Sequence, residues 1–152
     1  MNATALGARW LARRLIALAL VGTACAGDDS LHKAAHRGDV AQVRALLEKG
    51  GVDPDARDSY GGTALHAAMF QDRIEVVALL LAHGFDPNAI GPRNGYTPLH
   101  DAVWADNLPA ARLLLEHGAR TDIKGKDGLS PYEKAVREGK KKMADLLKRS
   151  RQ

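Results

Sequence analysis

The chain of 152 residues has one cysteine and few aromatic residues, which make up 5% of its composition. A single cysteine excludes a disulfide framework, and the 15 glycines show no three-residue period of the kind found in collagen-like fibres. Hydrophobic residues make up 45% of the chain, which is too much for a disordered polypeptide. The length fits one folded domain rather than a two-domain enzyme.

Motifs that carry enzyme chemistry are also missing from the sequence. There is no glycine-rich phosphate loop, no HExxH pair and no G-x-S-x-G elbow, and the only cysteine lies near the N-terminus. Most Asp and Glu residues occupy turn positions or positions expected on outer helix faces. We therefore expect a protein without catalytic activity, without a cofactor and without a metal site.

The first 26 residues contain three arginines and no acidic residue. An uncharged run rich in Leu and Ala, Leu15–Ala26, follows the arginines. This run of about twelve residues is shorter than the roughly 18 needed to cross a bilayer. The small residues Ala24 and Ala26 fit a cleavage site before residue 27. Residues 1–26 are therefore predicted to be a signal peptide, and the mature protein is expected in the periplasm or outside the cell.

Cys25 leaves a second interpretation open. A cysteine directly after an apolar run resembles the lipidation site of bacterial lipoproteins, in which case the leader would be 1–24 and Cys25 would carry the lipid anchor. Against this interpretation, Gly22 stands where lipoproteins usually have a large aliphatic residue. Arg13-Arg14 resembles a twin-arginine export signal, but no Ser or Thr precedes the pair.

The net charge of +4 is concentrated in two parts of the chain. Without residues 1–26, 19 basic residues face 18 acidic ones, so a nucleic-acid partner is not expected. Residues 28–123 have nine basic and fourteen acidic residues, whereas 124–152 have ten and four. The basic C-terminal segment is either a solvated cap that ends a stack or a surface for an acidic partner or anionic lipid. The residues considered for the second role are Lys140, Lys141, Lys142, Lys148, Arg149 and Arg151.

From residue 28 onward the sequence repeats. Leu-His pairs begin at positions 31, 65 and 99, a spacing of 34, and Tyr132-Glu133 follows 33 residues after the third pair. Gly50, Gly84 and Gly118 recur with the same spacing of 34. A fixed period of this length indicates stacked structural repeats.

Each repeat carries the signals of two short helices. Thr63, Thr97 and Ser130 stand where a side-chain oxygen can cap a first helix, and Gly84 and Gly118 follow the second helices. Helices this short need to bury their Ala and Leu faces against neighbouring repeats. The expected helices are 30–37 and 40–49, 64–71 and 74–82, 98–105 and 108–116, and 131–138 and 141–149.

The segments 95–100 (GYTPLH), 74–81 (IEVVALLL) and 117–119 (HGA) resemble the ankyrin repeat. The resemblance implies an all-α ankyrin-repeat solenoid over residues 28–150, with about four stacked helix-turn-helix repeats and short β-hairpin-like loops. The repeat bounds are about 28–57, 58–90, 92–124 and 125–150. The sequence departs from the pattern at Asp72 and Asp106, which replace glycine in the inter-helix turn, and at Gly51 and Gly91, which look like insertions.

The histidines at positions 32, 66 and 100 raise the question of a metal site. Side chains in register on stacked helices lie about 8–10 Å apart, whereas two ligands of one zinc ion lie within roughly 4 Å. The resemblance implies that His32, His66 and His100 bond backbone groups around the turns. His83 and His117 are expected at solvent-facing helix ends.

The resemblance further implies that partners bind the concave face, which is formed by the loop tips and the first helices. Four of the six aromatic residues after the leader fall there, and exposed aromatics on adjacent repeats favour an interface. In the alternative interpretation they only pack on their own loops. The predicted partner-binding residues are Tyr60, Phe70, Gln71, Arg93, Asn94, Tyr96, Trp104, Lys126 and Arg137.

Together these observations predict a monomeric, non-catalytic module of a bacterial cell envelope. It would bind another protein of the envelope and assist, inhibit or scaffold it. The alternative is a peripheral envelope component that binds an anionic membrane surface through its basic C-terminal cap.

Overall fold

The structure is a computed structural model that describes residues 30–69 and 73–150. Within these ranges the chain forms eight α-helices and no strand, so the prediction of an all-α fold is confirmed. None of the helices in the described ranges has the length and apolar character needed to cross a membrane. The helices are α2 (Ser30–Arg37), α3 (Val40–Lys49), α4 (Ala64–Met69), α5 (Ile74–Ala82), α6 (Pro98–Trp104), α7 (Leu108–Glu116), α8 (Pro131–Arg137) and α9 (Lys141–Arg149).

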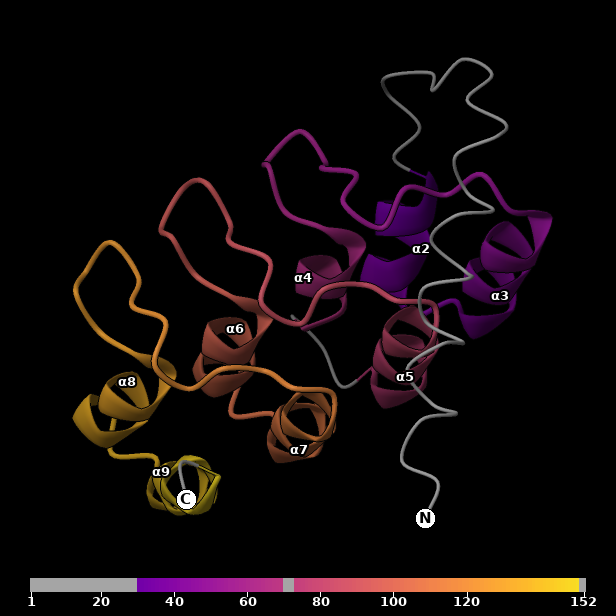
Figure 1. Cartoon of the computed structure of the whole chain (residues 1–152). Helices are drawn as coiled ribbons and strands as arrows, with labels where there is room; N and C mark the ends of the chain where they lie inside the picture. Colours follow the sequence, from indigo (N-terminus) through magenta and orange to yellow (C-terminus); the bar gives the residue numbers. More distant parts are fainter. Residues whose placement is uncertain (1–29, 70–72, 151–152) are drawn as a thin grey trace, which may run out of the picture.

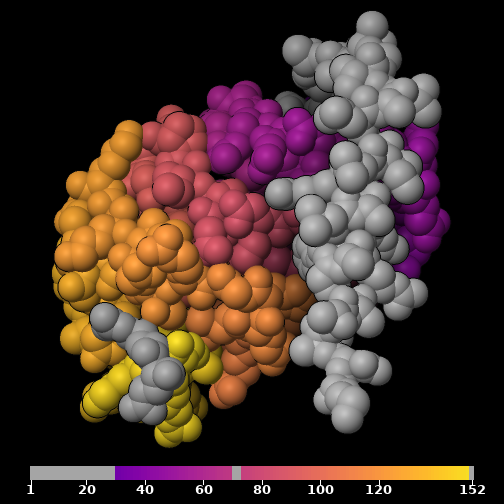
Figure 2. Space-filling view, in the orientation of Figure 1, coloured from indigo at the N-terminus to yellow at the C-terminus, as the bar shows by residue number. Residues whose placement is uncertain are grey.

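The helices stack as antiparallel pairs in two layers (Figure 1). The first helices of the pairs, α2, α4, α6 and α8, pack side by side in one row, and the second helices, α3, α5, α7 and α9, form the other row. The long loops between successive pairs project together beyond the row of first helices. In the space-filling view the repeats follow one another as a closely packed array (Figure 2). This is the predicted solenoid.

Local capping explains where the helices begin. The Ser130 hydroxyl accepts the N–H of Glu133 at 3.3 Å, and the Glu133 carboxylate accepts the N–H of Ser130 at 2.8 Å, which makes a capping box. The second helices α3 and α7 begin after Asp39 and Asn107, whose Oδ1 atoms each accept a backbone N–H of the first turn at 3.0 Å. These caps satisfy amides that have no partner inside the helix.

The observed helix bounds agree closely with the predicted ones. Helices α6 and α8 end one residue earlier than predicted, and the described part of α4 ends at Met69. Asp106 adopts a left-handed conformation with φ of 53°, so it takes the role of glycine in the inter-helix turn. Asp72, which was predicted to do the same, lies outside the described residues.

The core lies between the two layers and is continuous through all four repeats. Alanines of the first helices are fully buried, which lets the backbones of neighbouring helices approach closely: Ala34, Ala68, Ala102 and Ala135. Leu80, Leu114 and Leu147 of the second helices fill the space between the rows. Phe85 is 3% exposed and belongs to the same core.

Candidate functional site

The loops before α4, α6 and α8 are each closed by an acidic or amide side chain. In the second repeat the backbone N–H groups of Tyr60 and Gly62 both donate to Asp58 Oδ1 at 2.9 Å. The Oδ1 atoms of Asn94 and Asp127 likewise accept the N–H two residues further on, at 3.0 and 3.2 Å. Side chains of this type stabilise tight turns by bonding the backbone ahead of them. The three loops therefore share one hairpin-like shape, although the described residues contain no strand.

Hydrogen bonds between repeats hold the loops in a row. Lys126 N–H donates to the Asn94 carbonyl oxygen at 2.8 Å, and the Lys126 ammonium donates to the Pro92 carbonyl oxygen at 2.6 Å. One loop earlier, Arg57 Nη1 donates to the Ile90 carbonyl oxygen at 2.9 Å. Lys126 and Arg57 are exposed, but their charged groups bond the neighbouring loop, so the loop tips form an ordered edge.

In each of the first three repeats, a histidine on the first helix contacts the segment that leads into the first helix of the next repeat. The Nε2 atoms of His32, His66 and His100 lie 3.1, 3.2 and 3.1 Å from backbone carbonyl oxygens. The carbonyl groups belong to Ala56, Tyr96 and Leu129, which are 24 to 30 residues further along the chain. The implied structural role of these histidines is therefore seen directly in the contacts.

The protonation state of these histidines follows from the geometry. A carbonyl oxygen only accepts, so Nε2 carries the proton, and Nδ1 of His66 and His100 accepts the N–H of Thr63 and Thr97 at 3.2 and 3.1 Å. Burial lowers the pKa of both imidazoles, and the carbonyl contacts only partly oppose this effect. Both rings are neutral at pH 7. Within residues 30–69 and 73–150 no three His, Cys, Asp or Glu side chains are grouped to hold a metal ion.

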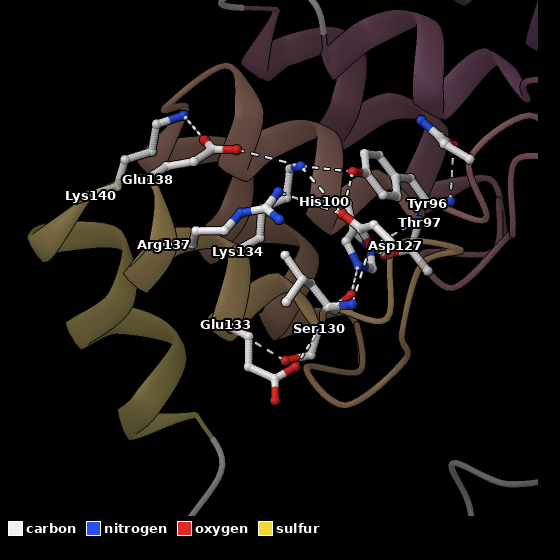
Figure 3. Close-up of polar contacts among 12 residues, drawn as sticks. Tyr96, Thr97, His100, Asp127, Ser130, Glu133, Lys134, Arg137, Glu138 and Lys140 are labelled. Atoms are coloured by element: carbon white, nitrogen blue, oxygen red, sulfur yellow. Dashed lines mark hydrogen bonds and ion pairs between the residues drawn. The ribbon is translucent and has the colours of Figure 1, made fainter.

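Tyr96 lies at the centre of a polar network between the third and fourth repeats (Figure 3). Its hydroxyl accepts a hydrogen bond from Lys134 Nζ at 2.7 Å and donates one to Asp127 Oδ2 at 2.8 Å. The Lys134 side chain is only 6% exposed and also pairs with Glu138 at 3.4 Å. Burial alone would lower the pKa of Lys134, but Tyr96 and Glu138 outweigh it and raise the pKa. The hydroxyl of Tyr96 is therefore used within the protein.

The Lys140 side chain also contacts groups of both the third and the fourth repeat. Its ammonium donates to the carbonyl oxygens of Val103 and Trp104 at 2.6 and 2.8 Å and pairs with Glu138 at 2.8 Å. The sequence grouped Lys140 with the solvated basic residues of the C-terminal cap, and that grouping is wrong for this residue. Lys140 instead caps the end of α6, whose last carbonyl groups have no partner within the helix.

A cleft of about 610 Å³ opens between the first helices and the loops of the first three repeats, and we call it the inner groove. Helix α2 contributes cationic side chains to it, and the loops before α4 and α6 contribute an aromatic ring, a guanidinium and an amide. Helix α4 contributes His66 and Ala67, and α6 contributes Asp101. The residues of the inner groove used below are Lys33, Arg37, Tyr60, Ala67, Arg93 and Asp101.

The structure separates the predicted partner-binding residues into groups. Tyr60, Arg93 and Asn94 line the inner groove. Trp104 and Arg137 are exposed further along the array and do not line it, whereas Tyr96 and Lys126 are engaged in contacts between repeats. Phe70, Gln71 and Cys25, like the whole predicted leader 1–26, lie outside the described residues.

Asp101 is a groove residue that sequence reasoning missed. It follows His100 on α6, where the second repeat has Ala67 and the first has Lys33, so the change from a small residue to an acidic one was visible in the aligned repeats. Burial raises the pKa of its carboxyl group to about 7, and Lys134 opposes the shift. Within the described part of the chain no hydrogen-bond donor contacts this carboxyl group. It therefore exchanges a proton near neutral pH.

A comparison with known protein families gives one finding for this arrangement of repeats, loops and groove. A family model described as ankyrin repeats, in three copies, matches residues 1–91 and 31–125. The matched residues make up well over half of the 152-residue chain.

Proposed function

Because the chain belongs to the ankyrin-repeat family, we propose that it binds another protein of a bacterial cell envelope through its inner groove and the exposed face beside it. Ankyrin repeats generally mediate protein–protein interactions and are typically non-catalytic. The bound protein would be assisted, inhibited or scaffolded without any chemistry by this chain.

One observation carries this proposal: side chains from three successive repeats converge on one cleft. The inner groove of about 610 Å³ has the size of a specific binding cleft and is lined by the first helices and the loop tips. The network of bonds between loops holds its rim in place before binding. A preformed groove loses little conformational entropy when it binds a partner, which favours affinity.

Exposed aromatic residues extend the same face. Tyr60 is 67% exposed and Trp104 is 59% exposed, and both were predicted to contact a partner. Neither side chain is needed to fill the core. Large exposed rings at one face are typical of the centre of a protein interface, because they bury much area at low entropic cost.

The envelope location rests on the sequence of residues 1–26, with its arginines, apolar run and small residues before position 27. Mass spectrometry of the protein recovered from its own cells tests this part. An N-terminus at Gly27 supports export with cleavage, a lipid-modified N-terminal Cys25 supports the lipoprotein alternative, and an uncleaved chain contradicts both.

The alternative of lipid binding through the C-terminal cap has a specific observation in its favour. Lys141, Lys142, Lys148 and Arg149 are exposed on α9 and form no ion pair among the described residues. Sedimentation with phosphatidylglycerol vesicles tests it, since replacing Lys141, Lys142 and Lys148 by Ser should abolish binding. Unchanged sedimentation of that variant excludes the cap as the lipid site.

The protein-binding proposal is tested by affinity capture from an envelope extract with the full chain as bait. The Tyr60→Ala/Trp104→Ala variant removes the aromatic face, and Arg44→Ala/Arg112→Ala, on exposed positions of α3 and α7, is the matched control. We expect one protein to be retained by the wild type and the control and lost with the aromatic variant. Equal retention by all three proteins would place the interface elsewhere and refute the proposal.

A further inference from the structure

We propose that the inner groove binds an acidic, extended segment of a partner protein, whose carboxylates pair with Lys33, Arg37 and Arg93. This inference rests on the proposed function and adds the chemistry of the partner. It follows from the distribution of paired and unpaired charges over the molecule, from the two carboxyl groups of the groove and from its shape.

Three exposed cations of the groove have no carboxylate partner in the part of the chain that the structure describes. Lys33 and Arg37 are one helical turn apart on α2, so they lie on the same face of that helix. Arg93 lies on the loop before α6, with its guanidinium 5.4 Å from the centre of the Tyr60 ring. Arg37 donates only to the neutral side chain of Gln42, at 2.8 Å. Within the described ranges none of the three forms an ion pair.

The loop and first helix of the fourth repeat show the opposite arrangement, whereas Lys141, Lys142, Lys148 and Arg149 on α9 form no ion pair among the described residues. Lys134, Arg137 and Lys140 each lie within 4.0 Å of a carboxylate of the same repeat, and Lys124, which directly precedes this repeat, lies 3.9 Å from the Glu133 carboxylate. The chain therefore neutralises some of its cations with nearby carboxylates. Leaving the cations of the groove unpaired keeps them available to an acidic partner, which they attract over distances of about 10 Å.

The two carboxyl groups of the groove do not cancel these cations. Asp58 Oδ1 accepts two backbone N–H groups of its own loop, so one of its two carboxylate oxygens is engaged in the turn. Asp101 has its pKa raised to about 7 by burial, so a large fraction of it is neutral at physiological pH. In the neutral form its hydroxyl donates a hydrogen bond, which suits a peptide carbonyl group lying beside it.

The shape of the site favours a peptide over other anions. The groove is recessed between helices and loops, so a flat bilayer surface reaches its rim only, whereas an extended chain enters it. Its lining also includes the ring of Tyr60 and the methyl group of Ala67, which fit an apolar side chain between acidic ones. Three cations beside two carboxyl groups are a poor match for the continuous negative charge of a nucleic acid.

The test is a selection of random peptides of about twelve residues displayed on phage, with the full chain immobilised. Enriched peptides are then synthesised, and their affinities are measured by fluorescence anisotropy at low and high salt. The groove variant is Lys33→Ser/Arg37→Ser/Arg93→Ser. The matched control, Lys141→Ser/Lys142→Ser/Lys148→Ser, removes the same charge from the C-terminal cap. Thermal melts followed by circular dichroism confirm that both variants remain folded, since all six side chains are exposed.

We expect the enriched peptides to be acidic and to bind the groove variant at least about tenfold more weakly than the wild type, with little change for the control. Binding should also weaken as salt is added. Neutral or basic peptides, no enriched peptide, or an affinity that responds to the cap variant instead would overturn the inference. Binding of phosphatidylglycerol vesicles that is lost in the groove variant would assign the groove to lipid and also overturn it.

The outcomes separate this inference from the proposed function. If an envelope protein is lost from the Tyr60→Ala/Trp104→Ala bait but retained by the groove variant, the protein-binding function stands and the acidic segment is refuted. If neither variant changes any binding, both are refuted.

Discussion

Tyr96 lies flat against His100, with ring centroids 4.8 Å apart and ring planes within 4° of each other. The imidazole is held by the Leu129 carbonyl oxygen, and the phenol is held by Lys134 and Asp127. One stacked pair therefore joins the third repeat to the loop and first helix of the fourth. This contact transmits a change in one repeat to the next, as nearest-neighbour coupling in a solenoid requires.

The Tyr96 hydroxyl should contribute to the free energy of unfolding through this junction. Tyr96→Phe keeps the stacked ring but leaves the buried ammonium of Lys134 without its shortest hydrogen bond. We expect a loss of about 1–2 kcal/mol in urea unfolding of the full chain. Tyr60→Phe, at a ring that is 67% exposed, is the control, and an equal loss for both variants would contradict the special role of Tyr96.

Asp101 should destabilise the folded protein at neutral and alkaline pH. Its folded-state pKa of about 7 lies above the ordinary value of 3.8, so the folded state binds its proton more tightly. The contribution of Asp101 to stability is therefore fully present below about pH 4 and is lost as the pH rises through about 7. Asp101→Asn removes this loss. We expect the variant to exceed the wild type by up to about 4 kcal/mol at pH 8, with the difference shrinking toward pH 4. A difference independent of pH would contradict the shifted pKa.

His66 and His100 should give the opposite dependence on pH. Burial lowers their pKa values below the ordinary 6.5, so the unfolded chain binds protons more readily than the folded one. Their contribution to stability is therefore present above about pH 6.5 and is lost as the pH falls through their lowered folded-state values.

The histidine prediction is measured in the Asp101→Asn background, because Asp101 acts in the opposite direction over part of the same range. We expect the free energy of unfolding to fall between about pH 7 and pH 5. Adding His66→Ala and His100→Ala should flatten this fall while lowering stability at pH 7. A slope that stays unchanged in the triple variant would show that other groups cause it.

The helices could be predicted from the sequence because their signals are local. Ser130 and Asn107 bond the N–H groups three residues further on, and Gly118 lies two residues after the end of α7, so three or four neighbouring residues decide each end. Asp106 was recognised as a substitute for glycine for the same reason. The repeat spacing then gives the stacking without any knowledge of long-range contacts.

The interaction partners of the charged side chains could not be predicted in the same way. Lys134 and Lys140 looked like members of a solvated basic cap, but Tyr96 lies 38 residues before Lys134 and the Val103 carbonyl lies 37 residues before Lys140. Charge counts over a segment carry no information about such distant partners. The groove residues Lys33 and Asp101 were missed because only the fold brings α2 and α6 to the same cleft.

The fourth repeat should be required for the solubility of the rest. Helices α8 and α9 cover the last face of the stack, where they pack on α6 and α7 and bury Met143 and Leu147 completely. Deleting residues 131–152 exposes this apolar face, so we expect aggregation or a broad, non-cooperative unfolding transition. Size-exclusion chromatography with light scattering and a urea titration test this, and a monomeric truncated chain with an unchanged transition would contradict it.

Alanine substitutions at Gly61 and Gly118 distinguish the effect of loop spacing at the groove rim from the effect of backbone strain alone. Both have positive φ, 78° and 86°, so an alanine at either position costs about 1 kcal/mol through its backbone alone. At Gly61 the added Cβ would also collide with the ring of Pro92 in the next loop, whereas at Gly118 nothing lies within 4 Å. The loop that carries Tyr60 would have to move away from the loop that carries Arg93. We therefore expect Gly61→Ala to lower the free energy of unfolding more than Gly118→Ala and, unlike it, to weaken binding of the peptides selected on the groove. Equal effects of the two substitutions on affinity would show that the spacing of these loops does not shape the site.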